Sequence, residues 1–348
     1  MVQVCELSAR RLIRRFEIEC VLFVGINCSL KSRWDVNRDI PPSIMSKLEE
    51  HWPNVKLSVK NHDRLATDRP SLSSPLLHSL SFCILNHTAT VVATDQLEQF
   101  SKLPTLREIL LESSNLRKLG IKFEYNWMPR QVKWRGNEAV PRLLNLPLES
   151  TDQLPPLEEL TFSGPTETYE FDLKHCQLLR QCMDWSHLRR LDLGLSCPQH
   201  FFEEIGSSLK SLESLTMGIR AGSRRYTHWR QGPLTCDTLE PVVTFLESIP
   251  ELLELNIIDL SPAVVEFASV ILDRHMSLRA LSYHTSINRS GYDRYRNQPG
   301  RDDACGWLTA QLDILREQCR DLSHLEIDFP LAAGKWVRAQ VLDQLCNR

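Results

Sequence analysis

Residues 116–122 read Leu-Arg-Lys-Leu-Gly-Ile-Lys, so Leu116, Leu119 and Ile121 follow the pattern Leu-x-x-Leu-x-apolar. In an extended segment, residues two positions apart point to the same side. Leu119 and Ile121 are therefore predicted to face inward, while Gly120 and Lys122 face outward. We expect Leu116 to pack under the strand from the preceding turn. A unit with one apolar face must be covered by neighbouring units.

The pattern occurs eight times, more often than random placement would give. The central leucines lie 24 to 44 residues apart, and the segments between them have helical spacing or loop composition. The eight copies are Leu77/Leu80/Phe82, Leu116/Leu119/Ile121, Leu157/Leu160/Phe162, Leu188/Leu191/Leu193, Leu212/Leu215/Met217, Leu252/Leu255/Ile257, Leu278/Leu281/Tyr283 and Leu322/Leu325/Ile327. Two looser copies, Ile13/Phe16/Ile18 and Trp52/Val55/Leu57, precede them.

Several connecting segments have apolar residues at helical spacing. Helices are predicted over residues 238–249, 262–272 and 305–322, with Ser261 as the N-cap of the second and Pro262 at its first position. Phe201, Phe202, Ile205 and Leu209 form another apolar stripe. The segment 334–348 is predicted to be a capping helix that shields the open end of the array.

These observations predict an α/β fold. We expect an irregular leucine-rich-repeat solenoid, or horseshoe, with one strand and one helix in each of about ten units. A single array is expected over residues 1–348, with looser repeats over residues 1–70.

The irregular units resemble the repeat region of fungal F-box/leucine-rich-repeat proteins. In that family, a Trp-Asp strand end leads to a Pro-Pro helix start and then to His-Pro before the next strand. Here Trp34-Asp35, Pro41-Pro42 and His51-Trp52-Pro53 resemble this segment. The resemblance implies substrate receptors of cullin-based ubiquitin ligases. The family's F-box opens with Leu-Pro-x-Glu, which is not found before Trp34, so the ligase adaptor is an expected partner only if an F-box lies upstream.

The composition sets broad limits on the class of protein. The net charge is -3, which gives no global attraction to nucleic acid. The eleven cysteines include no Cys-x-x-Cys pair, so buried reduced thiols and an intracellular location, cytoplasmic or nuclear, are expected. No apolar run approaches the ~20 residues of a membrane span, and the N-terminus does not resemble a signal or transit peptide.

No catalytic motif or cofactor-binding motif is found, so an enzyme is not expected and neither is a cofactor. His175, Cys176, Cys182 and His187 are the nearest approach to a metal cluster, but their spacing matches no standard zinc pattern. His175, Cys176, Leu179 and Cys182 are instead expected to form a packed helix face. An enzyme or enzyme regulator built on a repeat scaffold remains a third alternative, since a fold never excludes one.

Three inserts after predicted strands combine basic and aromatic residues. They span residues 124–142, 220–233 and 284–303 and carry a net charge of +7. Because strands of a solenoid exit on one edge, we expect the inserts to project from one rim. The candidate partner-binding residues on this rim are Trp127, Arg130, Trp134, Arg224, Arg225, Tyr226, Trp229, Arg230, Tyr292, Arg294, Tyr295 and Arg296.

Arginine and aromatic side chains dominate protein-binding hot spots. The sequence therefore predicts a protein-interaction scaffold whose rim binds an acidic or phosphorylated protein segment. One alternative is that the inserts are solvated loops without a shared ligand. Another is a nucleic-acid-binding solenoid that uses the basic rim, against which the acidic remainder of the chain argues.

Overall fold

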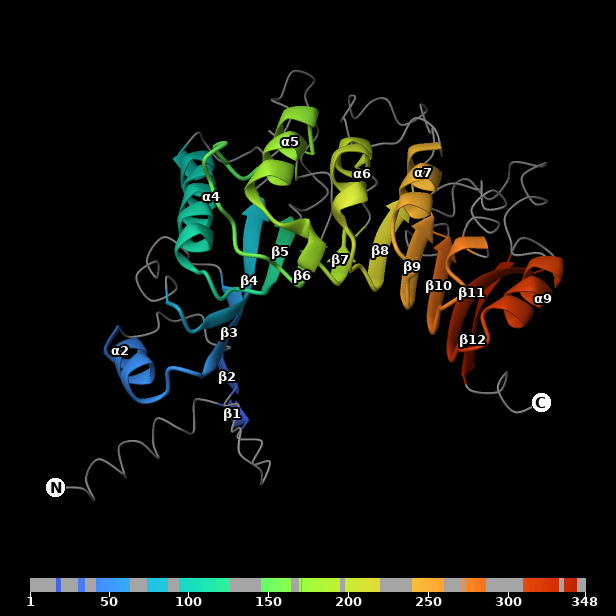
Figure 1. Cartoon of the computed structure of the whole chain (residues 1–348), viewed down its shortest axis with the longest axis horizontal. Coiled ribbons are helices and arrows are strands. Elements are labelled where there is room, and N and C mark those ends of the chain that lie inside the picture. Colours follow the sequence, from blue (N-terminus) through green and yellow to red (C-terminus); the bar gives the residue numbers. More distant parts are fainter. Residues whose placement is uncertain are drawn as a thin grey trace, which may run out of the picture. The chain divides into compact units, whose positions relative to one another are not determined.

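The structure of the chain is a computed structural model (Figure 1). It describes residues 17–19, 31–34, 42–62, 74–86, 94–125, 145–163, 169, 171–194, 198–219, 240–259, 271, 273–285, 309–331 and 335–342. The chain divides into two compact units. Unit 1 comprises Met1–Leu160 and Gln181–Asp184, and unit 2 comprises Thr161–Arg180 and Trp185–Arg348.

Unit 1 contains strands that lie side by side in chain order. They are β1 (Glu17–Glu19), β2 (Lys31–Trp34), β3 (Lys56–His62), β4 (Leu77–Asn86) and β5 (Lys118–Tyr125). β1 is antiparallel to β2, whereas β2 to β5 pair in parallel. Its helices are α2 (Pro42–His51) and α4 (Thr94–Glu112), and β6 (Glu159–Ser163) spans the division between the units.

Unit 2 repeats this arrangement. Its strands are β7 (Arg190–Asp192), β8 (Ser214–Ile219), β9 (Glu254–Asp259), β10 (Ala280–Thr285), β11 (His324–Leu331) and β12 (Lys335–Leu342). β7 to β11 are parallel, and β12 is antiparallel to β11. Its helical segments are α5 (Leu173–Cys182, whose end belongs to unit 1), η2 (Trp185–His187), α6 (Gln199–Ile205), η3 (Gly206–Ser208), α7 (Glu240–Ser248) and α9 (Thr309–Gln318).

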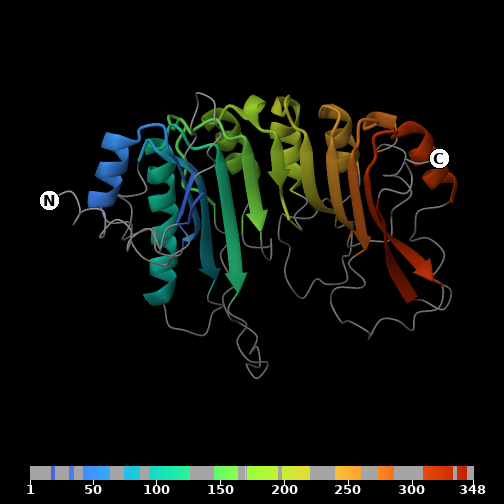
Figure 2. The ribbon, with the colours of Figure 1, turned by 90° about the horizontal axis from the view of Figure 1, so that it is seen from below.

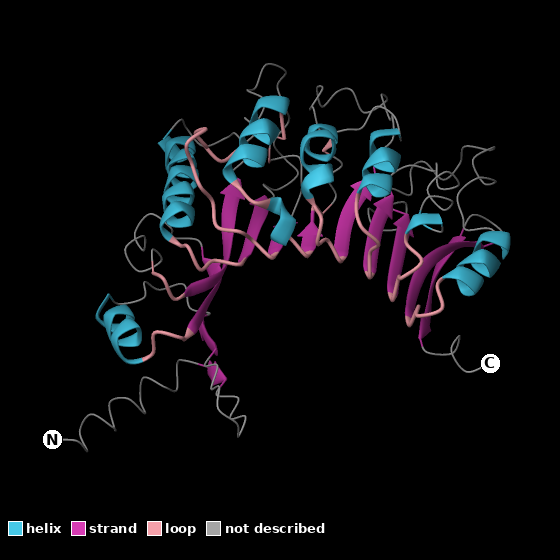
Figure 3. Cartoon of the chain, viewed as in Figure 1, coloured by secondary structure: helices cyan, strands magenta, loops and turns pink. Residues whose placement is uncertain are grey.

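The layers of unit 2 can be followed in three views. Figure 1 and Figure 3 show α6 and α7 on the same face of the sheet formed by β7, β8 and β9. Figure 2 shows β8 to β10 side by side from below. The expected α/β class is therefore confirmed, with an open and mainly parallel sheet.

Each of the eight copies of the sequence pattern coincides with the start of a strand, from β4 to β11. Every leading leucine, central leucine and final apolar residue of the eight copies is buried. The residues between them alternate: in β6 the pattern from Glu159 to Ser163 is half-buried, buried, half-buried, buried, half-buried. Leu116, Leu119 and Ile121 are buried, whereas Gly120 and Lys122 are partly exposed, as predicted.

A hydrogen bond recurs between successive copies. The carbonyl of Arg189, two residues before a central leucine, accepts N–H groups from Glu213 and Ser214 at 2.8 and 3.0 Å. The carbonyls of Glu213, Leu253 and Arg279 bind the next copy of the pattern in the same way, as does that of Arg117 in unit 1. The five copies that contain these carbonyls are therefore equivalent in backbone hydrogen bonding, and all eight copies are equivalent in burial.

The two looser copies differ from the eight regular ones. Val55 and Leu57 are buried, but the side chain of Trp52 is 48% exposed. The N–H of Trp52 donates to Leu48 O at 2.8 Å, so Trp52 continues the last turn of α2 instead of leading the strand. The other copy reaches the described residues only at β1, which is antiparallel to its neighbour, so it is not a repeat strand of the same kind.

Several helix predictions are confirmed in part. Phe201, Phe202, Ile205 and Leu209 are buried along α6 and its continuation. The helix predicted over residues 238–249 is α7, and that over 305–322 is observed as α9. The start of the helix predicted over 262–272, with Ser261 and Pro262, lies outside the described residues.

The prediction of a capping helix over residues 334–348 is wrong. Lys335–Leu342 form β12, which pairs with β11 in register along all eight residues. The segment alternates Val337, Ala339 and Val341 with Arg338 and Gln340, which is the period of a strand. Valine is also stiff about its first side-chain torsion and favours strands.

No helix in the described part of the chain is long and apolar enough to cross a membrane.

Candidate functional site

Most of the inserts predicted to bind a partner lie outside the described residues. The structure describes only Glu124, Tyr125, His284 and Thr285 of the three segments. All the predicted binding residues lie outside the described residues. They are Trp127, Arg130, Trp134, Arg224, Arg225, Tyr226, Trp229, Arg230, Tyr292, Arg294, Tyr295 and Arg296. The strands of unit 2 build a described surface that can contact a partner.

The outward positions of β7 to β11 form two rows. Because successive strand residues point to opposite faces, the residues flanking each central leucine point away from the leucine core. Pairing between strands sets them in line: Ser214 lies beside Arg190 and Glu254, and Asn256 beside Thr216 and Ser282. We call this surface the polar strand face and define it as Arg190, Asp192, Ser214, Thr216, Glu254, Asn256, Ala280, Ser282, His324 and Glu326.

All ten residues are at least partly exposed, in contrast to the leucines between them. Ser214, Thr216, Ala280 and Ser282 are small, so a partner's backbone can approach the strands closely. Further along the strands, Ile258 and His284 are buried although they also point away from the leucine core.

The first row contains an exposed charge pair bridged by a hydroxyl. Arg190 Nη2 lies 3.4 Å from Glu254 Oε2, and Ser214 Oγ donates to the same oxygen at 2.9 Å. Side chains of both charged residues are about half exposed, so water screens the pair and it stabilises the fold little. Its groups can exchange this contact for one with a partner.

Asp192 stands in the second row at the end of β7. Its Oδ1 accepts the N–H of Gly194 at 2.8 Å, and Gly194 has φ 58°, a left-handed conformation that favours glycine. Burial raises the pKa of the Asp192 carboxyl, with the bond from Gly194 opposing the shift. This turn fixes the direction in which the carboxylate leaves the strand.

At the other end of the second row, Glu326 lies between two histidines. Its carboxylate oxygens are 3.6 Å from His284 Nε2 and 3.9 Å from His324 Nε2. Asn256 lies two strands away in the same row, beyond Ser282, and has a buried Oδ1 without a hydrogen-bond partner among the described residues. The face therefore offers hydroxyls, an amide and carboxylates in fixed rows, which suits recognition of a polar protein segment.

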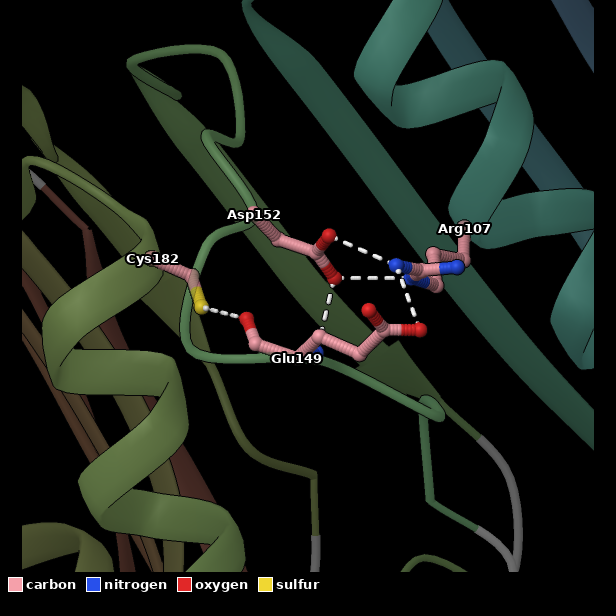
Figure 4. A network of polar contacts seen from close by, with 4 residues as sticks. All are labelled: Arg107, Glu149, Asp152 and Cys182. Atoms are coloured by element: carbon pink, nitrogen blue, oxygen red, sulfur yellow. Dashed lines mark hydrogen bonds and ion pairs between the residues drawn. The ribbon is translucent and has the colours of Figure 1, made fainter.

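A second cluster of polar groups lies in unit 1 (Figure 4). Arg107 of α4 donates from Nε and Nη2 to the two carboxylate oxygens of Asp152, both at 2.7 Å, and its Nη2 lies 3.1 Å from Glu149 Oε1. Glu149 N–H donates to Asp152 Oδ2 at 2.8 Å, and Cys182 Sγ donates to Glu149 O at 3.2 Å.

This network holds structure together and does not resemble a reaction centre. The side chain of Asp152 is only 5% exposed. The hydrogen bond from Arg107 holds the pKa of Asp152 below its usual value, so the carboxylate stays ionised. Burial raises the pKa of the Cys182 thiol, which keeps the sulfur protonated and a poor nucleophile. The network ties the irregular segment 145–158 to α4.

The predicted packed helix face of α5 is confirmed. His175, Cys176, Leu179 and Cys182 are all buried. His175 Nε2 lies 2.7 Å from Tyr169 OH. The backbone N–H of His175 donates to Asp172 Oδ1 at the start of the helix. Burial raises the pKa of Cys176 to about 12, so this thiol is inert. Among the described residues, no group of three or more His, Cys, Asp or Glu is placed to hold a metal ion.

Two buried histidines of unit 2 make its stability depend on pH. Burial lowers the pKa of His175 and of His275 to about 4 in each case. The unfolded chain takes up these protons at a pKa of about 6.5, so it binds more protons than the folded state between pH 4 and 6.5. Stability is therefore complete above pH 6.5 and falls by up to about 3 kcal/mol for each histidine as pH drops to 4.

We expect the denaturant midpoint of unit 2 to fall between pH 7 and 4.5. His275→Asn should flatten this dependence, because it removes one of the two titrating side chains. Asparagine can still accept the N–H that Leu252 donates to His275 Nδ1 at 3.3 Å. His187→Gln, at an exposed position, is the control and should leave the profile unchanged. A midpoint that does not move between pH 7 and 4.5 would contradict the account.

Sequence reasoning missed a position that the copies share. In five of the eight copies, the residue three before the leading leucine is buried in the turn that enters the strand, and its carbonyl accepts the leucine N–H. This position is Ser74, Ser113, Trp185, His275 and Cys319 in different copies. Its residue types vary so widely that only alignment of the copies on their leucines could reveal it.

Compared with protein families and with curated proteins, the chain matches none of them.

Proposed function

We propose that this protein is a non-enzymatic interaction scaffold, built as a leucine-rich-repeat array, whose polar strand face binds another protein. We further propose that it acts inside the cell as the substrate-recognition part of an F-box-type ubiquitin ligase receptor. The resemblance of the repeats and of the Trp34 to Pro53 segment motivates the ligase role.

The polar strand face is the observation that carries the scaffold proposal. Five neighbouring strands present Asp192, Thr216, Asn256, Ser282 and Glu326 at one level, and all five side chains are partly exposed. Parallel strands hold these groups rigidly, which lowers the entropy that a partner must overcome on binding.

The equivalence of the copies supports the leucine-rich-repeat type. Each copy places three apolar residues in the core and begins one strand, and in five copies the carbonyl two residues before the central leucine accepts N–H groups from the next copy. Buried free thiols at Cys176, Cys182 and Cys319 support a reducing compartment.

The described surface does not favour the nucleic-acid alternative. The polar strand face carries the carboxylates of Asp192, Glu254 and Glu326 against the single guanidinium of Arg190, and carboxylates repel phosphate groups. That alternative therefore depends on the three basic inserts alone.

The first experiment is affinity purification of the tagged full chain from its native cell, followed by identification of the proteins that co-purify. Recovery of the cullin adaptor supports the ligase-receptor proposal. Other proteins without the adaptor support a scaffold that is not a ligase receptor. Recovery of nucleic acid alone, in a manner that falls steeply with salt, would overturn both.

A variant of the same chain tests the contribution of the basic rim. Replacing Arg224, Arg225 and Arg230 together by alanine should abolish capture of an acidic or phosphorylated partner and leave thermal unfolding unchanged. If the variant still captures the partner, the rim does not bind it.

A further inference from the structure

The sheet of unit 2 ends in a regular strand. Among the strands that the structure describes, β11 alone pairs with β12. β12 is therefore the last strand of the sheet, and its other edge pairs with no described strand. The pairing with β11 runs from His324↔Leu342 to Leu331↔Lys335 with no shift in register. A strand in an antiparallel pair directs the N–H and C=O groups of alternate residues away from its partner, where they can pair with a further strand.

β12 has few of the features that protect edge strands. Its sequence, Lys-Trp-Val-Arg-Ala-Gln-Val-Leu, contains no proline or glycine and no acidic residue. Eight residues make a long edge, and only Lys335 and Arg338 carry charge. Short length, proline, bulges and charge are the usual means of preventing pairing between edges.

We propose that β12 pairs with β12 of a second copy of this chain, so that two unit 2 sheets join in an antiparallel, two-fold arrangement. A two-fold axis perpendicular to a sheet passes through a residue that lies opposite itself in the other copy. The two registers that pair most of β12 have Arg338 or Ala339 at this axis.

Charge decides between these two registers. An axis at Arg338 would set two guanidinium groups opposite each other, which destabilises a strand pair. An axis at Ala339 instead sets Arg338 opposite Gln340, Val337 opposite Val341 and Trp336 opposite Leu342 of the other copy. The two apolar pairs are of the kind that stabilises neighbouring strands. We therefore assign the axis to Ala339.

Sedimentation of the full chain tests this arrangement. The wild-type chain should shift from monomer to dimer as its concentration rises. Ala339→Lys and Ala339→Glu should each stay monomeric, because each sets like charges opposite each other at the axis. Mixed in equal amounts, the two variants should form dimers again, since lysine then lies opposite glutamate. Ser207→Lys, at an exposed position on η3, is the control and should dimerise like the wild type.

Three outcomes would overturn the proposal: a wild-type chain that is monomeric at every concentration, a dimeric Ala339→Lys variant, or a mixture of the two variants that stays monomeric although both are folded by circular dichroism. Hydrogen exchange on the wild type needs no substitution. Amides of Lys335–Leu342 should exchange more slowly at the concentration where dimers form, and an unchanged rate would also contradict the pairing.

Discussion

Replacing Leu215 by alanine is expected to lower the free energy of unfolding of unit 2 by about 2–5 kcal/mol. Leu215 is 1% exposed and lies between Leu191 and Leu255 of the neighbouring strands. Alanine would leave a cavity between three copies of the pattern, and close packing allows little relaxation. Chemical denaturation followed by circular dichroism measures the change.

The neighbouring residue provides the control for this variant. Thr216 is one position along β8 and belongs to the polar strand face, so Thr216→Ala should change the free energy of unfolding by no more than about 0.5 kcal/mol. Equal losses of unfolding free energy for Leu215→Ala and Thr216→Ala would contradict the description of one buried face and one solvent-exposed face of the sheet.

Asp152→Ala is expected to destabilise unit 1 by about 3 kcal/mol, because it removes the buried carboxylate of Arg107 and leaves the guanidinium only the exposed carboxylate of Glu149. Both oxygens of Asp152 accept from Arg107 at 2.7 Å, and one of them also accepts the N–H of Glu149. Removing Asp152 therefore leaves several donors unsatisfied in a site where the carboxylate was 5% exposed.

Two further variants separate this buried pair from its exposed neighbour. The Glu149 side chain is 68% exposed, so Glu149→Ala should cost less than about 1 kcal/mol. In the double variant Arg107→Ala with Asp152→Ala, the loss should be smaller than the sum of the two single losses, because the residues act as a pair. Additive losses, or an Asp152→Ala cost no greater than that of Glu149→Ala, would show that the network does not hold segment 145–158.

The leucine pattern was sufficient to predict the strands and their faces. Central leucines such as Leu119, Leu215 and Leu255 each have a leucine three residues before them and an apolar residue two residues after them. The period of two along the strand then decides which residues are buried. The stripe of Phe201, Phe202 and Ile205 was equally informative for α6. In these segments the local periodicity agrees with the observed burial, so a single sequence is enough to predict the secondary structure.

Elements without such a pattern could not be predicted. α4 contains Pro104 inside the helix, and its apolar residues do not form a clear stripe, so no helix was expected there. Trp336, Val337, Val341 and Leu342 are compatible with both a helix and a strand, and pairing with β11 decides in favour of β12. Tertiary contacts outweigh local preference in such short segments.

The candidate site was harder to predict than the fold. Arg107 and Asp152 are 45 residues apart in sequence, and no periodic signal joins them. The rows of the polar strand face depend on register: Thr216, Asn256 and Ser282 are unremarkable polar residues until pairing sets them side by side. The inserts stand out in the sequence because arginine and tryptophan are conspicuous, whereas small polar residues on strands are not.

We propose that the polar strand face binds a protein partner, and the affinity of the purified full chain for the partner that co-purifies with it tests this claim. Thr216→Arg with Ser282→Arg fills the second row on both sides of Asn256. Ser207→Arg with Thr244→Arg adds the same charge at exposed positions on η3 and α7. We predict that the first variant binds at least about tenfold more weakly, a loss of about 1.4 kcal/mol, and that the second binds like the wild type. Equal affinity of both variants and the wild type would contradict the claim.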